Sequence, residues 1–204
     1  MDNISFNTYI ITDDNTPIEK QLFHLKKLKT YKYKNDLAIQ IRFNKQSDDN
    51  VSFFIEELLK ENLGIKLIVN NRIDLMNKYK LDGVHFKDND TYKKIDLKKY
   101  KNKIFIKSTH SIDSIIDAEK FNLDAVTYGP IFDTPSKRKF GKPNGYELIK
   151  TNYSKLNIPV FALGGINLDN IKELKAYFTG IAAIRLFINE NIIDNLNKRR
   201  EIWK

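Results

Sequence analysis

The 204-residue chain contains no cysteine. This absence excludes disulfide bonds, thiolate metal sites and a cysteine nucleophile, and it agrees with a cytoplasmic location. No run of about 18 apolar residues occurs, so we expect no contact with a membrane. The first residues, MDNISFNTYIITDD, lack the basic start and apolar stretch of a signal peptide. We therefore expect a cytoplasmic protein.

Charge is unbalanced toward lysine. The 35 Lys and Arg residues exceed the 26 Asp and Glu residues, and the formal net charge is +9. Such a balance is compatible with binding of nucleic acid or of a phosphorylated ligand. The lysines are spread along the whole chain, however, and no RNA-recognition or zinc-finger pattern is present. We interpret most of the charge as a solvated surface and expect no nucleic-acid partner.

Short runs rich in Val, Ile, Leu and Phe recur along the chain. They are nearly continuous in apolar residues, which is typical of strands that are buried on both faces of a parallel sheet. The predicted strands are Thr8–Thr12, Leu37–Phe43, Lys66–Asn70, Gly83–Phe86, Lys103–Ser108, Asp124–Tyr128, Pro159–Leu163 and Gly180–Ile184.

Segments between these strands show apolar residues at helical spacing. The clearest are Pro17–Tyr31, Ser47–Asn62, Ser111–Phe121 and Asn167–Phe178. Ser or Asn opens the last three, as is expected of helix N-caps. Strands that alternate with helices in this way predict parallel pairing through right-handed crossovers.

Eight such units in residues 1–204 predict one domain, a single (β/α)8 TIM barrel. The main alternative is an open, doubly wound sheet. We prefer the barrel because the strand count is eight. In addition, two glycines follow the seventh strand, whereas no G-x-G-x-x-G sequence occurs anywhere.

The active site of a TIM barrel is built from the loops after the strand C-termini. Polar residues at these positions would converge on one mouth, where cations, amides and hydroxyls suit an anionic, phosphorylated ligand. They are Thr12, Asp13, Asp14, Arg42, Asn44, Asn70, Asn71, Arg72, His85, Lys87, Asp88, Asp90, Lys107, Ser108, Thr109, His110 and Arg185.

A phosphate site is expected after the seventh strand, where Gly164 and Gly165 precede a predicted helix. Glycine lets backbone N–H groups approach an anion, and a helix N-terminus favours negative charge. Arg185, directly after the eighth strand, would add a bidentate contact. The alternatives are a tight turn at the glycines and a surface arginine that pairs with Glu190.

Six motifs in chain order resemble those of the thiamine phosphate synthase family, which includes the TenI-type thiazole tautomerases. They are YIITDD, IQIRFN, KLIVNNRIDLMNKYKLDGVHFKDND, IKSTHSIDS, YGPIFDTPSK and IPVFALGGI. The family fold is a (β/α)8 barrel, in agreement with the strand count. Its synthases join a pyrimidine diphosphate to a thiazole phosphate and release diphosphate with Mg²⁺. The resemblance implies a transferase of thiamine biosynthesis with small phosphorylated substrates and Mg²⁺ as cofactor.

The resemblance also implies roles for matching positions. Arg42 and Lys137 would hold the diphosphate, and Ser108 would lie beside the reacting pyrimidine carbon. Asp90 and Asn71 occupy the positions of the family's metal ligands. The implied substrate-binding residues are Gln40, Asn70, His110, Thr134, Ser136, Gly164, Gly165, Ile184 and Arg185.

The stretch Tyr128–Gly145 is long and basic for a connection after a strand. It holds three of the eight glycines and four of the 35 Lys and Arg residues. Such a loop can close over a diphosphate, bring in Lys137 and exclude water. The alternative is an insertion without a role.

Several positions depart from the family pattern. Asn44 replaces a lysine, and Asn71 replaces an aspartate, which leaves a poorer ligand for Mg²⁺. Two other functions therefore stay open: a TenI-type thiazole tautomerase and a non-catalytic barrel that binds thiamine phosphate or a precursor. The tautomerases have a histidine where this chain has Pro130, so the chain is more similar to the synthases there. The oligomeric state is open, with a homodimer as one option.

Overall fold

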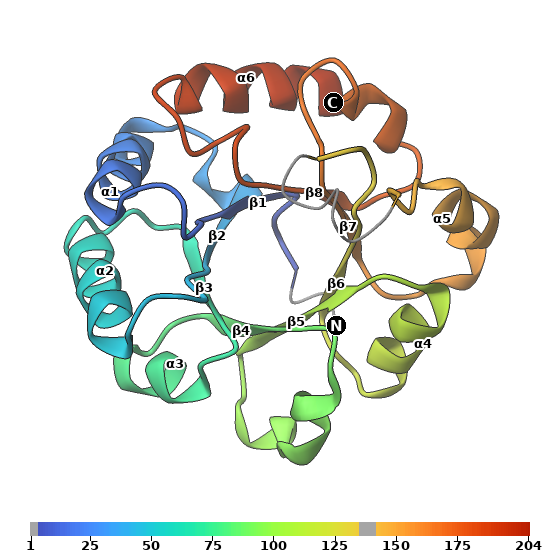
Figure 1. The fold of residues 1–204 in the computed structure, drawn as a ribbon, viewed down its shortest axis with the longest axis horizontal. Helices are drawn as coiled ribbons and strands as arrows, with labels where there is room; N and C mark the ends of the chain where they lie inside the picture. The colour runs from blue at the N-terminus through green and yellow to red at the C-terminus, as the bar shows by residue number, and fades with distance from the viewer. Residues whose placement is uncertain (1–3, 135–141) are drawn as a thin grey trace.

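A computed structural model describes residues 4–134 and 142–204, apart from the side chains of residues 90 and 91. Eight parallel strands form a closed barrel in sequence order, and β8 pairs with β1 (Figure 1). The predicted (β/α)8 barrel is confirmed, and the open doubly wound sheet is excluded.

Each strand agrees with its predicted range to within two residues at either end. Their burial explains the continuous apolar runs, because one face of every strand points into the barrel and the other toward helices. The strands are β1 (Thr8–Ile11), β2 (Leu37–Ile41), β3 (Lys66–Asn70), β4 (Gly83–Phe86), β5 (Ile104–Thr109), β6 (Ala125–Tyr128), β7 (Val160–Leu163) and β8 (Gly180–Ala183).

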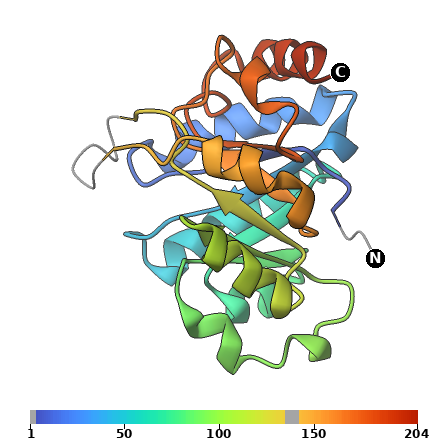
Figure 2. The ribbon, with the colours of Figure 1, turned by 90° about the vertical axis from the view of Figure 1, so that its right-hand side faces the viewer.

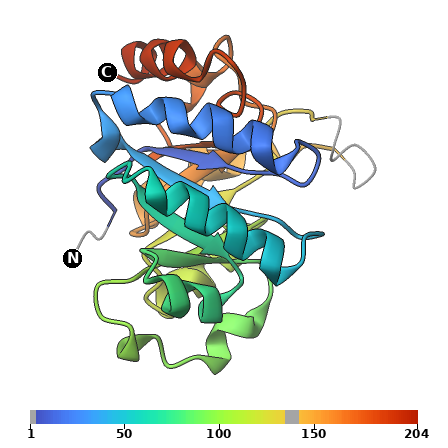
Figure 3. The same cartoon turned by 90° about the vertical axis from the view of Figure 1, so that its left-hand side faces the viewer.

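Helices surround the barrel on the outside (Figure 1). Figure 3 shows α1 and α2 side by side, and Figure 2 shows α4 next to α5 on another flank. The α-helices are α1 (Ile18–Lys26), α2 (Asp48–Lys60), α3 (Ile73–Tyr79), α4 (Ile112–Lys120), α5 (Glu147–Asn152) and α6 (Ile192–Trp203). Short 3-10 helices are η1 (Lys27–Thr30), η2 (Lys34–Asp36), η3 (Asp90–Lys94), η4 (Leu97–Lys99), η6 (Tyr153–Lys155) and η7 (Ile171–Leu174).

Two of the predicted N-caps form. The Ser47 hydroxyl accepts a hydrogen bond from the Asn50 N–H at 3.3 Å, and the Ser111 hydroxyl accepts one from the Ser114 N–H at 3.2 Å. Each satisfies a backbone donor that the first helical turn leaves without a partner.

The predicted helix Asn167–Phe178 is wrong, because only η7 forms there. The Asn167 side-chain oxygen accepts from the N–H groups of Asp169 and Asn170. The Asn170 side chain accepts from the Asn167 N–H and donates to the Gly165 carbonyl. These bonds give the backbone local partners that compete with a regular helix.

A buried arginine joins the last helix to the chain just before β1. Arg199 of α6 is only 2% exposed. Its Nη1 donates to the Asn7 side-chain oxygen at 2.8 Å, and its Nη2 donates to the Asn7 carbonyl at 2.6 Å. Burial lowers the pKa of Arg199 to about 10, so the group remains charged at neutral pH. The last helix is thus fastened to the first strand.

Asn7→Ala should destabilise the fold, because it removes one acceptor of a buried charged donor. We expect a loss of about 1.5–3 kcal/mol in the free energy of unfolding, measured by urea denaturation. Lys198→Ala, at an exposed position of the same helix, is the control and should change stability by less than about 0.5 kcal/mol. Equal stabilities of the two variants would contradict this role of Asn7.

Candidate active site

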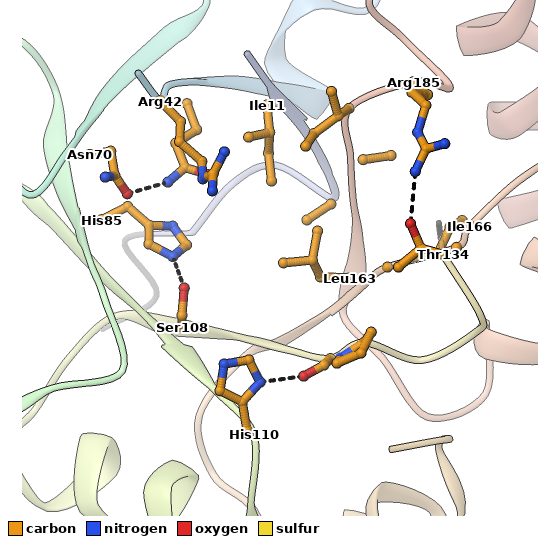
Figure 4. Close-up of a pocket in the computed structure, with 18 of the residues that line it drawn as sticks. Ile11, Arg42, Asn70, His85, Ser108, His110, Thr134, Leu163, Ile166 and Arg185 are labelled. Atoms are coloured by element: carbon orange, nitrogen blue, oxygen red, sulfur yellow. Dashed lines mark hydrogen bonds between the residues drawn. The ribbon is translucent and has the colours of Figure 1, made fainter. Parts of the chain in front are cut away.

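A cavity of about 590 Å³ opens at the C-terminal ends of the strands (Figure 4). Residues on or just after all eight strands contribute to its lining. This is the end of the barrel at which TIM-barrel enzymes carry their active sites.

The cavity has one polar wall and one apolar wall. Gln40, Asn70, His85 and Ser108 come from the neighbouring strands β2 to β5. Ile11 of β1 and Leu163 of β7 lie across the cavity from these residues in Figure 4, and Ile184, which follows β8, also lines the cavity. A ligand with a flat, apolar ring and polar edges would match both walls.

The structure brings most of the candidate residues together at this cavity. Its lining includes Gln40, Arg42, Asn70, Ser108, His110, Thr134, Gly164, Gly165, Ile184 and Arg185. Lys137 and Ser136 lie outside the described residues, and so does the side chain of Asp90. Asn71 does not line the cavity; its backbone is left-handed (φ 53°) and its side chain is exposed.

Several polar residues that we expected at the mouth serve the loops instead. The Asp13 carboxylate accepts from the N–H groups of Asn15 and Thr16, and the Asp14 carboxylate accepts from those of Asn44 and Lys45. Such side chains replace backbone partners in turns. These aspartates therefore shape the loops after β1 and β2 and do not line the cavity.

Four more residues that we expected at the mouth do not line the cavity, because of strand alternation or local hydrogen bonds. Lys107 and Thr109 flank the inward-facing Ser108 on β5, so they point to the outside of the barrel. Thr12 exchanges hydrogen bonds with the backbone of Arg42. Arg72 donates to Asp48 and to the Phe43 carbonyl and lies outside the cavity lining.

An amide chain runs along the polar wall. Gln40 is 2% exposed, and its Nε2 donates to Oδ1 of Asn70 at 3.1 Å. Nδ2 of Asn70 lies 3.4 Å from Oδ1 of Asn44, within reach of a second bond. Among the described residues, no group donates to Oε1 of Gln40, so this wall can accept from the amino group of a heterocycle.

A second polar chain runs from Tyr9 in the barrel interior to His85 and Ser108 of the cavity wall. Nδ1 of His85 lies 3.3 Å from the Tyr9 hydroxyl, and its Nε2 lies 2.9 Å from Oγ of Ser108. Tyr9 is fully buried, and His85 is its one hydrogen-bonding neighbour among the described residues. A buried hydroxyl proton without an acceptor is costly, so Tyr9 donates to Nδ1. Nε2 then carries the ring proton and donates to Ser108.

Burial keeps His85 neutral. Removal from solvent, with a smaller contribution from the nearby Arg42 guanidinium, lowers the pKa of His85 to about 3. The unfolded ring titrates near about 6.5, so between these pH values the unfolded state binds more protons. The contribution of His85 to the free energy of unfolding is therefore complete above about pH 6.5. It is lost as the pH falls toward the folded-state pKa of about 3.

His110 is held by the loop after β6. Its Nδ1–H donates to the Gly129 carbonyl, so Nε2 of the neutral ring is an acceptor (Figure 4). Nδ2 of Asn144 donates to the carbonyls of His110 at 2.9 Å and Gly129 at 3.2 Å. These bonds join the last part of the loop after β6 to the end of β5.

Gly164 and Gly165 are required by both backbone conformation and space. Their φ angles are +103° and +69°, and a Cβ atom would lie 2.8 Å from Pro130 or 2.6 Å from the Asp133 carbonyl oxygen. Among the described residues, the N–H groups of Gly165 and Ile166 donate no hydrogen bond. Two free donors therefore lie in a loop that lines the cavity.

Arg185 lies beside this glycine loop. Its Nη2 donates to the Thr134 hydroxyl at 2.7 Å (Figure 4), and the pairing with Glu190 that we considered is not observed. The contact joins the end of β8 to the loop after β6 and holds the guanidinium at the cavity.

The barrel, the cavity at its C-terminal end and the glycine loop agree with one family. The family model described as thiamine monophosphate synthase matches residues 8–187. The chain belongs to this family.

Individual relatives cover most of the chain. It is 35% identical to a thiamine-phosphate synthase of Prochlorococcus marinus subsp. pastoris, over 88% of this chain and 50% of that protein. It is 28% identical to a thiamine-phosphate synthase of Methanocella arvoryzae, over 92% and 89% of the two chains. The chain thus spans about half the length of the Prochlorococcus relative.

A solved structure of the same type superposes closely. Thiamine phosphate pyrophosphorylase from Pyrococcus furiosus has a TM-score of 0.79 and 25% identity, over 98% of this chain and 96% of that one. The likeness extends over the whole barrel.

The described part of the chain has no group of three His, Cys, Asp or Glu residues that could hold a metal alone. Proteins commonly bind Mg²⁺ through one or two carboxylates together with substrate phosphates. Asp88 is a carboxylate of the cavity lining. None of the helices in residues 4–134 and 142–204 combines the length and apolar character that crossing a bilayer requires.

Tyr9 and Asn144, which hold the cavity residues His85 and His110 in place, were not identified from the sequence. Tyr9 belongs to the quoted YIITDD motif, and its alternation with Ile11 could have placed it inside the barrel. Asn144 carries no such signal, since its contacts depend on how the loop after β6 returns.

The tautomer of His85 can be tested directly. Nitrogen-15 NMR of the three histidines should show His85 protonated at Nε2 and neutral down to about pH 5. In Tyr9→Phe the donor to Nδ1 is lost, so the ring should populate both tautomers. His24 and His110 are internal references in every spectrum. A His85 ring protonated at Nδ1 in the unaltered protein would reject the hydrogen-bond order given above.

Proposed function

We propose that this chain is a thiamine phosphate synthase, a transferase that joins hydroxymethylpyrimidine diphosphate to thiazole phosphate. One observation carries the proposal. The cavity has a cation at each side: Arg42 stands by the polar wall and Arg185 by the glycine loop, with Ile11 between them in Figure 4. One anionic group could thus be bound at each side of the cavity, with the pyrimidine and thiazole rings stacked between them.

The polar wall suits the pyrimidine diphosphate. The amide chain of Gln40 and Asn70 offers both donors and acceptors to an aminopyrimidine edge. Arg42 and Lys87, which line the cavity, offer charge to the diphosphate. Lys137 is our further candidate for this end and stays a prediction, since it lies outside the described residues.

The opposite side suits the thiazole phosphate. The N–H groups of Gly165 and Ile166, the Arg185 guanidinium and the Thr134 hydroxyl can all donate to phosphate oxygens. Leu163 and Ile184 form the apolar surface on which the thiazole ring would rest.

The chemistry requires charge neutralisation more than a nucleophile. The bond between the pyrimidine methylene carbon and the diphosphate breaks, and the diphosphate leaves with the electron pair. The thiazole nitrogen then forms the new C–N bond. Ser108 accepts a hydrogen bond from neutral His85, so it is not activated as a nucleophile, and its own proton can point to a ligand.

Mg²⁺ is the proposed cofactor. Asp90 is the first candidate ligand, with Asp88 nearby on the same loop, whereas Asn71 lies off the cavity. When bound, the ion would neutralise the charge that develops on the departing diphosphate. We further propose a cytoplasmic enzyme that binds these small phosphorylated substrates and no nucleic acid.

A direct assay tests the proposal. Purified protein with Mg²⁺, hydroxymethylpyrimidine diphosphate and thiazole phosphate should form thiamine phosphate and diphosphate in equal amounts. Removal of Mg²⁺ by chelation should abolish the rate. If no product forms although both precursors bind in calorimetry, the barrel is a tautomerase or a non-catalytic binding protein.

Arg185→Ala separates the two substrates. The KM for thiazole phosphate should rise by about tenfold or more, because a charge-assisted phosphate contact is lost. The KM for the pyrimidine diphosphate should change by less than about twofold. Glu190→Ala, at a nearby exposed position, should alter neither value. An equal rise in both KM values would reject the assignment of Arg185 to the thiazole phosphate.

A further inference from the structure

Lys107 is a buried cation on the outer face of the barrel wall. It lies on β5 next to Ser108, but its side chain is 3% exposed and does not line the cavity. Its ammonium group lies 3.4 Å from the Asp88 carboxylate and 3.6 Å from the Asp117 carboxylate. The Tyr92 hydroxyl lies 3.4 Å away, and the ammonium is 5.0 Å from the Tyr92 ring centre.

The two carboxylates do not depend on Lys107 equally. Asp117 on α4 accepts a hydrogen bond from the Tyr92 hydroxyl and pairs with Lys93 at 3.2 Å. Asp88 has no second lysine or arginine within ion-pair distance among the described residues, and its other partner is the neutral Ser114 hydroxyl at 2.7 Å. Lys107 is therefore the cation that balances Asp88.

Asp88 is a negative charge at a place that should attract anions. It lines the cavity together with Arg42 and Lys87, the groups assigned above to the diphosphate. An uncompensated carboxylate there would repel a diphosphate that binds in the same cavity. A buried ammonium group is itself costly unless it is paired.

We propose that Lys107 acts through the barrel wall as a positioning residue that neutralises and orients Asp88. It thereby keeps the diphosphate end of the cavity attractive to anions and fixes the loop after β4. The identity of the anion rests on the proposed function, but the electrostatic role does not require turnover.

The test measures binding of inorganic diphosphate by calorimetry in the presence of a chelator, so that no metal contributes. Lys107→Met should raise the Kd by about tenfold, on the order of one charge pair in a partly buried site. Lys107→Arg, which keeps the charge, should bind within about threefold of the unaltered protein. Lys99→Met removes one lysine charge from an exposed site and should change the Kd by less than about twofold.

The double variant Lys107→Met with Asp88→Asn distinguishes neutralisation of the Asp88 charge from a purely structural role of Lys107. If Lys107 neutralises Asp88, removing both charges should restore the Kd to within about threefold of the original value. A double variant that binds as weakly as Lys107→Met would overturn the proposal, and so would an unaltered Kd in Lys107→Met.

Asp88→Asn alone keeps the proposal testable if Lys107→Met does not fold. This variant should bind diphosphate as tightly as the unaltered protein or more tightly, because an acidic charge is lost and Lys107 remains. Weaker binding would overturn the proposal. Protein that binds diphosphate with this pattern but forms no thiamine phosphate would contradict the proposed function alone, so the two failures can be distinguished.

Discussion

The closed parallel ladder is the constraint on which the rest of this structure depends. Because β1 pairs with β8 as well as with β2, every strand has one face enclosed by the barrel and one covered by helices. Alternation along each strand then assigns every side chain to one of these faces. Apolar residues such as Ile106 and Phe161 fill the interior, and the polar residues of the cavity follow at the C-terminal layer.

That polar layer is organised before any ligand arrives. Buried hydrogen bonds join Tyr9, His85 and Ser108 in one chain and Gln40 and Asn70 in another. Each side chain is held by its neighbour, so little orientation remains to be lost on binding. The same burial that fixes these groups also keeps the His85 ring neutral.

A buried charge on the outer face of the barrel wall also contacts a residue of the cavity. Lys107 faces away from the cavity, yet its partner Asp88 lines it. A barrel wall is one strand thick, so a cation behind it can balance a carboxylate in front. The Asp88 carboxylate after β4 thus pairs with a cation from the neighbouring strand β5.

The sequence by itself determined the number of strands, their approximate bounds and the caps at Ser47 and Ser111, because periodicity and capping are local. Its motifs also determined the family. Only the tertiary structure decided which polar residues reach the cavity. Lys107 is turned outward by strand alternation, but its burial depends on α4 and on the loop after β4, which are separate in sequence. The segment Asn167–Phe178 has helical spacing, and the contacts of its own asparagines prevent the helix. Long-range packing and competing side-chain bonds are physical effects that local pattern does not contain.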